Sequence, residues 1–388
     1  MKNLRIMWLH SHLTLPVGAT NYILQVIREL SRNNTVGLYV QKSTPEFEQL
    51  YKNAGIEIIT LSKYSTGDML FWLNFSGQIK KEVQILKSQV KDYDLVISSM
   101  FPMNVIASSL NLPHLQFCFQ PFAFFWDPLM IKKMSVPKRI FLYLLRSRFG
   151  KLDIQSTKKS GSILTINEGS KKSISEIYNR DSVPVFMGVN VRKVNNEEIA
   201  KKYTGKKIIL HTTDWTPLKK TTWLIQQFLL IQKKYPDVLL LITETKTDAH
   251  LKNAELKKIR NEEIKNIEFL GTVSTDSLHQ YFALADIVVY SGFGTAITTS
   301  LFVLECMAYE TTPVVSKGAS EDVEDGKTGL VFNNDIEFQN CVLTLLSDES
   351  MRRRLGEQAS AYVAQRHSWA NVGKKFEEES FKLSDKGQ

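Results

Sequence analysis

Short apolar segments alternate with amphipathic helical segments along most of this chain, and that alternation limits the folds open to it. In the first half, apolar runs predict buried strands at 5–10, 36–40, 56–61 and 95–98, with a helix from Thr20 to about Ser31. The second half repeats the pattern, with strands at 208–212, 238–243, 267–270, 287–290 and 312–316 and helices at 221–234, 274–284 and 298–309. Such alternation is typical of a parallel sheet covered by helices on both faces.

The length of 388 residues exceeds one ordinary domain, so we expect two doubly wound parallel-sheet domains in tandem. A polar stretch at 190–207 predicts the linker between them. We therefore predict domains at 1–190 and 191–367, followed by a C-terminal helix at 368–388. Ligands of such sheets bind outside the carboxyl ends of the strands, so the site is expected where the two domains face each other.

Glycine-rich sequence follows the strand expected at 287–290 and precedes a helix. This arrangement presents free backbone N–H groups and the positive end of the helix, which together bind phosphate readily; the candidate residues are Gly292, Gly294, Thr295 and Thr298. Glu305 lies inside that otherwise apolar helix, where a carboxylate must be paired or hydrogen-bonded. Glu305 could accept hydrogen bonds from two vicinal sugar hydroxyls, or it could be an ordinary helix charge that bonds to nearby backbone.

Positive charge is concentrated in the first half of the chain. Lys and Arg total 49 against 40 Asp and Glu, for a net charge of +9. Residues 129–159 hold nine basic residues and one acid among many apolar ones, and an aromatic stretch precedes them. A helix of this composition favours an anionic membrane surface; the candidate contacts are Lys132, Lys133, Lys138, Arg139, Arg146, Arg148, Phe124 and Trp126. The alternative is a core helix with basic ends, and no nucleic-acid motif is visible.

The compartment follows from the cysteines and from hydropathy. Cys118, Cys306 and Cys341 have apolar neighbours and no metal-ligand spacing, which favours reduced core residues of a cytosolic protein. The N-terminus lacks a signal-peptide cleavage pattern, and no apolar run reaches the length of a membrane span. We expect a cytoplasmic protein, peripheral on the inner face of the cell membrane.

The block from Leu304 to Val331 resembles a known family. The motifs are Leu304-Glu-Cys-Met-Ala308, Pro313-Val-Val-Ser316, Gly318, Glu321-Asp-Val-Glu-Asp-Gly326 and Thr328-Gly-Leu-Val331. They are similar to the C-terminal signature of family-4 retaining glycosyltransferases of GT-B fold, and Gly18 matches the glycine loop of that family's first domain. The resemblance implies two facing Rossmann-like domains, with a C-terminal helix that crosses back to the first one.

The resemblance also implies roles for individual residues. Lys219 would neutralise the diphosphate, Glu305 would hold the nucleotide ribose, and Glu321 would bind the donor sugar. Three family positions are altered, because Asp214, Ile297 and Phe119 stand where the family has Arg, Glu and His. His10 and His12 end the first strand and are candidates to orient an acceptor, although a structural role is the alternative.

These observations lead to one functional hypothesis and two alternatives. We expect a metal-independent retaining glycosyltransferase without a cofactor, whose partners are a nucleotide-diphosphate sugar, a lipid-linked or glycolipid acceptor and an anionic membrane, but not nucleic acid. The alternative from another class is a non-catalytic nucleotide-sugar-binding or scaffold subunit of a glycan-assembly complex, which the three altered positions favour. Phosphorylase-like or sucrose-type chemistry is a weaker enzymatic alternative.

Overall fold

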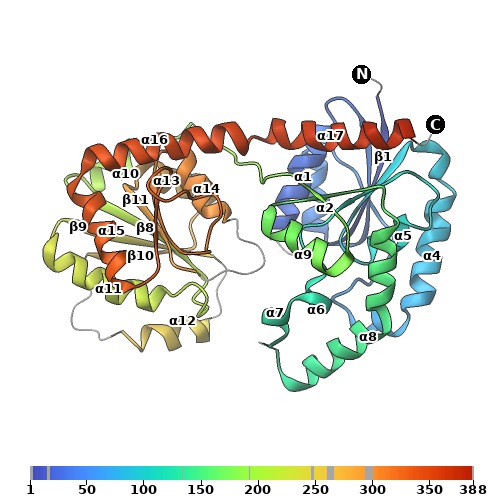
Figure 1. Ribbon diagram of the computed structural model, residues 1–388, viewed down its shortest axis with the longest axis horizontal. Helices are drawn as coiled ribbons and strands as arrows, with labels where there is room; N and C mark the ends of the chain where they lie inside the picture. The colour runs from blue at the N-terminus through green and yellow to red at the C-terminus, as the bar shows by residue number, and fades with distance from the viewer. Residues whose placement is uncertain are drawn as a thin grey trace. The chain divides into compact units, whose positions relative to one another are not determined.

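The chain divides into two compact units (Figure 1). Unit 1 comprises residues 1–188 and 369–388, and unit 2 comprises residues 189–368. The computed structural model describes residues 3–14, 18–132, 134–191, 193–245, 249–259, 266–292 and 300–386. Each unit is a parallel sheet with helices on both faces, which confirms the fold class predicted from the strand–helix alternation.

Unit 1 is built on a seven-stranded sheet of order β3-β2-β1-β4-β5-β6-β7. Its strands are β1 (Arg5–Leu13), β2 (Thr35–Ser43), β3 (Ile58–Thr60), β4 (Leu95–Ser99), β5 (His114–Phe117), β6 (Ser162–Thr165) and β7 (Val183–Pro184). Its helices are α1 (Gly18–Leu30), α2 (Pro45–Asn53), α3 (Met69–Leu73), α4 (Phe75–Lys87), α5 (Met103–Ala107), α6 (Ala123–Trp126), α7 (Pro128–Lys132), α8 (Val136–Lys158), α9 (Glu168–Tyr178) and α17 (Trp369–Lys386), with a short 3₁₀ turn at Val90–Asp92.

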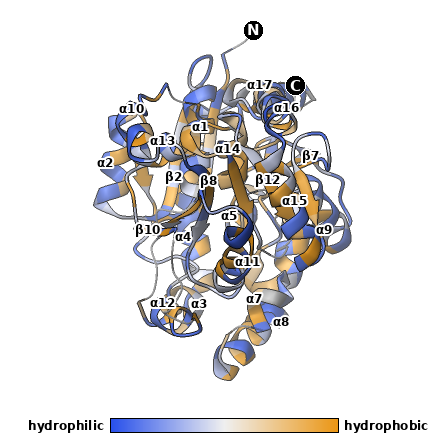
Figure 2. Cartoon of the chain, turned by 90° about the vertical axis from the view of Figure 1, so that its left-hand side faces the viewer, coloured by the Kyte–Doolittle hydropathy of each residue, from blue (hydrophilic) through white to orange (hydrophobic). Residues whose placement is uncertain are grey.

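Unit 2 has a six-stranded sheet of order β10-β9-β8-β11-β12-β13. Its strands are β8 (Lys207–Thr213), β9 (Val238–Glu244), β10 (Ile267–Gly271), β11 (Ile287–Tyr290), β12 (Thr312–Ser316) and β13 (Leu330–Phe332). Its helices are α10 (Glu197–Lys202), α11 (Thr221–Lys234), α12 (Ala249–Leu256), α13 (Thr275–Leu284), α14 (Leu301–Ala308), α15 (Asp335–Ser347) and α16 (Glu349–Arg366). The strands are the hydrophobic layer, and the helices that cover them are of mixed hydropathy (Figure 2).

Both sheets place their functional edge in the same way. Every strand pair is parallel, so all carboxyl ends in a unit meet at one edge. In both sheets the first strand lies beside the fourth, and chain order reverses there. The residues that follow β1 and β4 in unit 1, and β8 and β11 in unit 2, are therefore neighbours at that switch point.

The last helix completes unit 1 from the far end of the chain. Trp369 and Phe376 of α17 pack against Tyr22 and Trp8, with ring centroids 5.4 and 5.6 Å apart respectively. The Glu379 carboxylate accepts a hydrogen bond of 3.0 Å from the Ser162 hydroxyl. This packing confirms the C-terminal helix that the resemblance implies for the first domain.

The segment predicted as a linker is not wholly irregular. It contains the helix α10, which has two glutamates in its first turn and two lysines in its last. Charges placed in this way stabilise a short polar helix through its dipole, although the segment lacks the apolar periodicity that marked the other helices. The start of the helix predicted at 298–309 lies outside the described residues, and α14 is described from Leu301.

A buried carboxylate ties helix α8 to the rest of unit 1. Asp153 is 1% exposed, and its oxygens accept hydrogen bonds from Asn104 Nδ2 (2.8 Å), Trp126 Nε1 (2.8 Å) and Tyr178 Oη (2.9 Å). Burial raises the pKa of this carboxyl, while the three donors favour its charged form. One side chain thus joins α8 to α5, α6 and α9.

Removing that carboxylate should destabilise unit 1. Asp153→Ala removes the carboxylate that accepts from Asn104, Trp126 and Tyr178, and we expect a loss of about 3 kcal/mol in the free energy of unfolding. Asp181→Ala is the matched control, because the Asp181 side chain is 88% exposed and its nearest cation, on Lys171, is 3.7 Å away; we expect less than about 0.5 kcal/mol there. Urea unfolding of both variants checks this, and equal losses would contradict it.

Candidate functional site

The loop after β8 places Lys219 at the carboxyl edge of the second sheet. Two residues of this loop, Trp215 and Lys220, adopt left-handed backbone conformations with φ of 58° and 50°. The Trp215 amide donates to Thr213 Oγ1 at 2.8 Å, and the Lys219 amide donates to the Thr216 carbonyl at 3.0 Å. These contacts fold the loop back on itself, so Lys219 is held next to the first turn of α11.

The end of β11 meets this loop. Lys219 Nζ lies 3.5 Å from Tyr290 Oη and 4.8 Å from the centre of its ring, and Ser291 Oγ donates to the Lys219 carbonyl at 2.9 Å. The Gly292 carbonyl accepts from Ser316 Oγ at 2.9 Å, which joins β11 to the end of β12. Gly292 lies against the Tyr290 ring and the Leu218 carbonyl, which a Cβ at this position would meet at 3.3 and 3.4 Å. A half-buried ammonium group therefore lies where three strands end.

The remaining donor-site predictions are only partly covered by the structure. Gly294, Thr295 and Thr298, like the altered position Ile297, lie outside the described residues. Glu305 is half-buried on α14, among the buried Val303, Leu304, Cys306 and Met307. Glu321 is exposed in the segment between β12 and β13. The roles assigned to these residues stay predictions.

Asp214, at the position where the resemblance places an arginine, and two other polar residues, His211 and Arg180, are engaged in contacts of their own. Asp214 Oδ1 accepts from the Thr216 amide (2.9 Å) and hydroxyl (2.6 Å), so it shapes the loop. His211 is fully buried, burial lowers its pKa to about 4, and its ring contacts the Val289 carbonyl at 3.0 Å. His211 is thus neutral at pH 7. Arg180, in unit 1, donates to the Lys158 carbonyl at the end of α8.

The two histidines of β1 differ in exposure. His10 is 2% exposed and burial lowers its pKa to about 3, so its ring is neutral at pH 7. His12 is half-buried, its Nδ1 lies 2.8 Å from Ser11 Oγ, and burial also lowers its pKa. Only His12 is partly exposed at this edge, and its acceptor role stays a prediction. Gly18 opens α1, and the three residues before it lie outside the described ranges.

Helix α8 carries an exposed apolar face. Val136, Ile140, Tyr143 and Leu144 recur at the spacing of one helix face and are 56%, 56%, 54% and 63% exposed. Leu142, Leu145 and Phe149 turn inward to the core that also contains Phe71 and Trp72 of α3. The outward side of α3 is apolar as well, with Met69, Leu70 and Leu73 exposed. The core alternative therefore accounts for only one side of α8.

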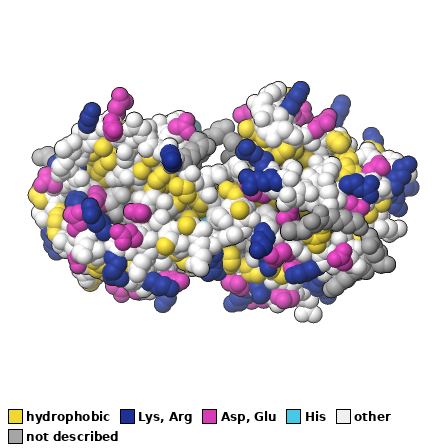
Figure 3. Space-filling model, turned by 90° about the horizontal axis from the view of Figure 1, so that it is seen from above, with side chains coloured by type: hydrophobic (Ala, Val, Ile, Leu, Met, Phe, Trp, Pro, Cys, Tyr) yellow, Lys and Arg dark blue, Asp and Glu magenta, His cyan; other side chains and the backbone are white. Residues whose placement is uncertain are grey.

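Basic side chains accompany this face. Lys132, Lys138, Arg146 and Arg148 are exposed and Arg139 is half-buried, whereas Lys133 lies outside the described residues. The Arg146 guanidinium lies 4.5 Å from the centre of the Trp126 ring. Trp126 and Phe124 are half-buried, and Trp126 donates to Asp153, so the exposed apolar side chains come mainly from α8 itself. On the surface that Figure 3 shows, basic and acidic side chains are interspersed.

Sequence reasoning did not identify Tyr290, nor which apolar residues of the predicted membrane-contact helix face outward. Tyr290 was recognised only as the end of a strand, although an aromatic hydroxyl directly before a glycine-rich loop is a usable signal. The exposed face of α8 could have been found from the spacing of Val136, Ile140 and Leu144, because residues four apart share a side of a helix. Among the described helices, none combines the length and apolar character needed to cross a membrane.

Comparison with known proteins shows where the sequence similarity lies. Residues 206–348 match the family described as "Glycosyl transferases group 1". An uncharacterized glycosyltransferase of Methanocaldococcus jannaschii, MJ1069, is 19% identical over 92% of this chain and 93% of its own. The lipopolysaccharide 1,2-N-acetylglucosaminetransferase of Salmonella typhimurium is 22% identical over 96% of each chain.

Solved structures share the whole fold. A glycosyltransferase from Rickettsia africae superimposes with a TM-score of 0.75 at 14% identity and covers 99% of each chain. HepE of Anabaena, solved in complex with UDP and glucose, superimposes with a TM-score of 0.70 at 16% identity, over 97% of this chain and 99% of its own. The two-sheet architecture is therefore that of GT-B glycosyltransferases.

Acid should destabilise both units through the buried histidines. The folded-state pKa values are about 3 for His10 and about 4 for His211, both below the unfolded value of 6.5. At any pH between the folded and unfolded pKa values, the unfolded chain therefore binds more protons than the folded chain. Stability is then lost as the pH falls below 6.5, by about 2 kcal/mol for each ring between pH 7 and pH 5. Urea unfolding at both pH values should show a smaller loss in His211→Gln, with His250→Gln, at an exposed position, as the matched control. An unchanged loss in His211→Gln would refute the assignment.

Proposed function

We propose that this chain, which has the GT-B fold, is a glycosyltransferase that transfers a sugar from a nucleotide-diphosphate sugar with retention of anomeric configuration. The proposed acceptor is a lipid-linked sugar or glycolipid at the cytoplasmic face of the cell membrane. The position of Lys219 carries the donor half of this proposal. Its ammonium group lies at the switch point of unit 2, beside the Tyr290 ring and hydroxyl. HepE was solved with UDP and glucose, so uridine diphosphate sugars are the first donors to test.

The chemistry requires positive charge at the departing diphosphate. The bond between the anomeric carbon and the diphosphate oxygen breaks, the acceptor oxygen bonds to that carbon from the same face, and the acceptor proton passes to the departing phosphate. Lys219 and the backbone N–H group of Gly292 would stabilise the charge that develops on this phosphate. In this scheme the protein's own donors and cations carry that charge without a metal ion.

The exposed apolar face of α8 supports the acceptor half. Val136, Ile140 and Leu144 would enter the acyl boundary of a bilayer, while Lys138 and Arg139 meet anionic head groups. Helices α7 and α8 both belong to unit 1, and within that unit they lie at the end away from α17 (Figure 1). The relative from Salmonella typhimurium acts on lipopolysaccharide, which fits a lipid-borne acceptor. The free cysteines Cys118 and Cys306 fit a reducing compartment.

One observation favours a second candidate, a nucleotide-sugar-binding subunit without turnover. Asp214 stands where the resemblance places a phosphate-binding arginine, and its carboxylate is occupied by Thr216. Charge neutralisation at the diphosphate then depends on Lys219 more heavily than in a site with two cations. A binding subunit would hold the donor and leave the acceptor unchanged.

Replacing Lys219 should separate these candidates. With membrane lipid extract and a panel of nucleotide sugars, we expect transfer by the parent chain and a loss of about a hundredfold in Lys219→Ala, because one charged donor at a developing oxyanion contributes about 3 kcal/mol. Lys206→Ala is the matched control, since Lys206 precedes β8 at the opposite edge of the sheet and pairs with Asp237. Donor binding by the parent chain without transfer from any donor would establish the binding subunit.

Membrane contact should depend on the apolar face. In liposome flotation the parent chain should bind vesicles that contain anionic lipid better than neutral vesicles. Ile140→Ser combined with Leu144→Ser should weaken binding at least tenfold, because burying each side chain contributes about 1.5 kcal/mol or more. Ile336→Ser, on α15 of unit 2 and 72% exposed, is the matched control for loss of a surface apolar residue. Equal flotation of all three proteins would exclude α8 as the membrane contact.

A further inference from the structure

A hollow of about 520 Å³ opens on unit 1 where β3 ends. The segment that leads from β3 to α3 forms one wall and α4 forms the other; its polar lining includes Ser62, Lys63, Tyr64, Asn74, Gln78 and Lys81. The volume falls in the range of small-molecule sites. The hollow lies at the carboxyl edge of the first sheet and uses none of the residues assigned to the donor.

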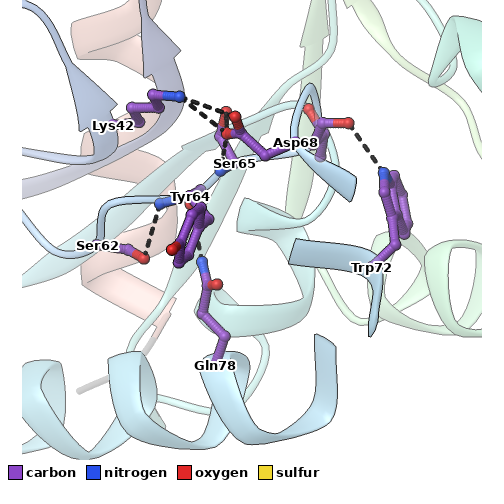
Figure 4. A network of polar contacts seen from close by, with 8 residues as sticks. Lys42, Ser62, Tyr64, Ser65, Asp68, Trp72 and Gln78 are labelled. Carbon is purple, nitrogen blue, oxygen red and sulfur yellow. Dashed lines mark hydrogen bonds and ion pairs between the residues drawn. The ribbon is translucent and has the colours of Figure 1, made fainter. Parts of the chain in front are cut away.

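The wall formed by residues 62–68 is held in place by side chains on three sides (Figure 4). Lys42 Nζ pairs with the Asp68 carboxylate at 2.9 Å, and the same carboxylate accepts from the Ser65 amide at 2.9 Å. Trp72 Nε1 donates to the Thr66 carbonyl at 2.9 Å, and Gln78 Nε2 donates to the Tyr64 carbonyl at 2.8 Å. Because this segment is already fixed, a ligand that binds against it would lose little free energy to ordering of the loop.

A buried carboxylate lies at the floor. Glu82 lines the hollow and is 1% exposed, and its two oxygens accept from Gln78 Nε2 and Gln41 Nε2, each at 2.9 Å. Burial raises the pKa of Glu82. Apolar side chains would hold α4 against β2 at least as well as this polar set, so packing alone does not account for it.

The rim combines positive charge with hydroxyl, amide and aromatic groups. Lys63 and Lys81 are both exposed, and within the described residues neither has a carboxylate at salt-bridge distance. Tyr64 is 40% exposed and supplies a rigid aromatic surface, while Asn74 and Ser62 supply polar groups. Two cations next to neutral hydrogen-bonding groups suit a ligand that has many hydroxyls and an acidic group.

We propose that this hollow binds a saccharide that carries a carboxylate or a phosphate. The sugar ring lies against Tyr64, its hydroxyls bond to Asn74 and Gln78, and its acidic group pairs with Lys63 and Lys81. The use of this saccharide as the head group of the acceptor is a separate step that rests on the proposed function.

Binding of free ligands to the full chain tests the site without any transfer reaction. The probes are glucuronic acid, glucose 6-phosphate, glucose and inorganic phosphate, measured by titration calorimetry. We expect both acidic sugars to bind more tightly than glucose and than inorganic phosphate. Lys81→Gln should weaken the binding of both acidic sugars about fivefold and leave the binding of glucose unchanged, as expected for loss of an exposed ion pair. Asn74→Ala should weaken the binding of all three sugars. The Asn74 side chain makes no capping hydrogen bond to α4, so its removal should leave the helix intact.

Lys80→Gln is the matched control. Lys80 is on the same helix and equally charged, but it lines a different hollow with Lys87 and Val105. Inorganic phosphate that binds as tightly as glucose 6-phosphate would overturn the saccharide site in favour of a plain anion site. Absence of sugar binding, or equal effects of Lys80→Gln and Lys81→Gln, would overturn it too. Sugar binding without any transfer would support the saccharide site and contradict the proposed function. Transfer with an acceptor KM that is unchanged in Lys81→Gln would contradict only the role of this hollow as the acceptor site.

Discussion

The parallel arrangement of every described strand pair is the constraint on which the rest of this structure depends. A parallel strand cannot be reached by a tight turn, so the chain must cross each sheet face between strands, and the crossing segments become the helices. The same rule gathers all carboxyl ends at one edge of each sheet. In unit 2, Tyr290 ends β11 and Lys219 lies in the loop after β8; in unit 1, His12 lies near the end of β1 and the wall of the saccharide hollow follows β3. These groups belong to different strands and still lie at such an edge.

Much of the fold could be predicted because buried strands of parallel sheets are continuous apolar runs. The helix expected at 221–234 has those bounds in the structure, and the strand at 312–316 does as well. Strands β5 and β6 escaped notice because each has only four residues and includes polar ones, such as His114 and Thr165, that are buried through tertiary contacts. Local pattern does not reveal that kind of burial.

The candidate site was harder to predict than the fold, and the reason is physical. A sequence motif gives the type of a residue. The protonation state of its side chain, and the direction in which that side chain points, depend on neighbours that are distant in sequence. Histidine can carry a positive charge, yet His211 is buried, contacts Val289 and Thr221, and is neutral at pH 7. The hollow near β3 has no motif at all, because Lys42, Tyr64 and Gln78 come together only through the packing of β2, the loop and α4.

The return of α17 to unit 1 affects the order in which the protein can fold during synthesis. Unit 2 is complete in the nascent chain at Ser368, whereas unit 1 still lacks the helix that covers Trp8 and Tyr22. The part of the protein that is made first is therefore finished last, and its apolar surface stays uncovered while the whole second unit is translated. A nonsense mutation near the 3′ end of the message would harm the domain encoded at the 5′ end more than the one just before the stop.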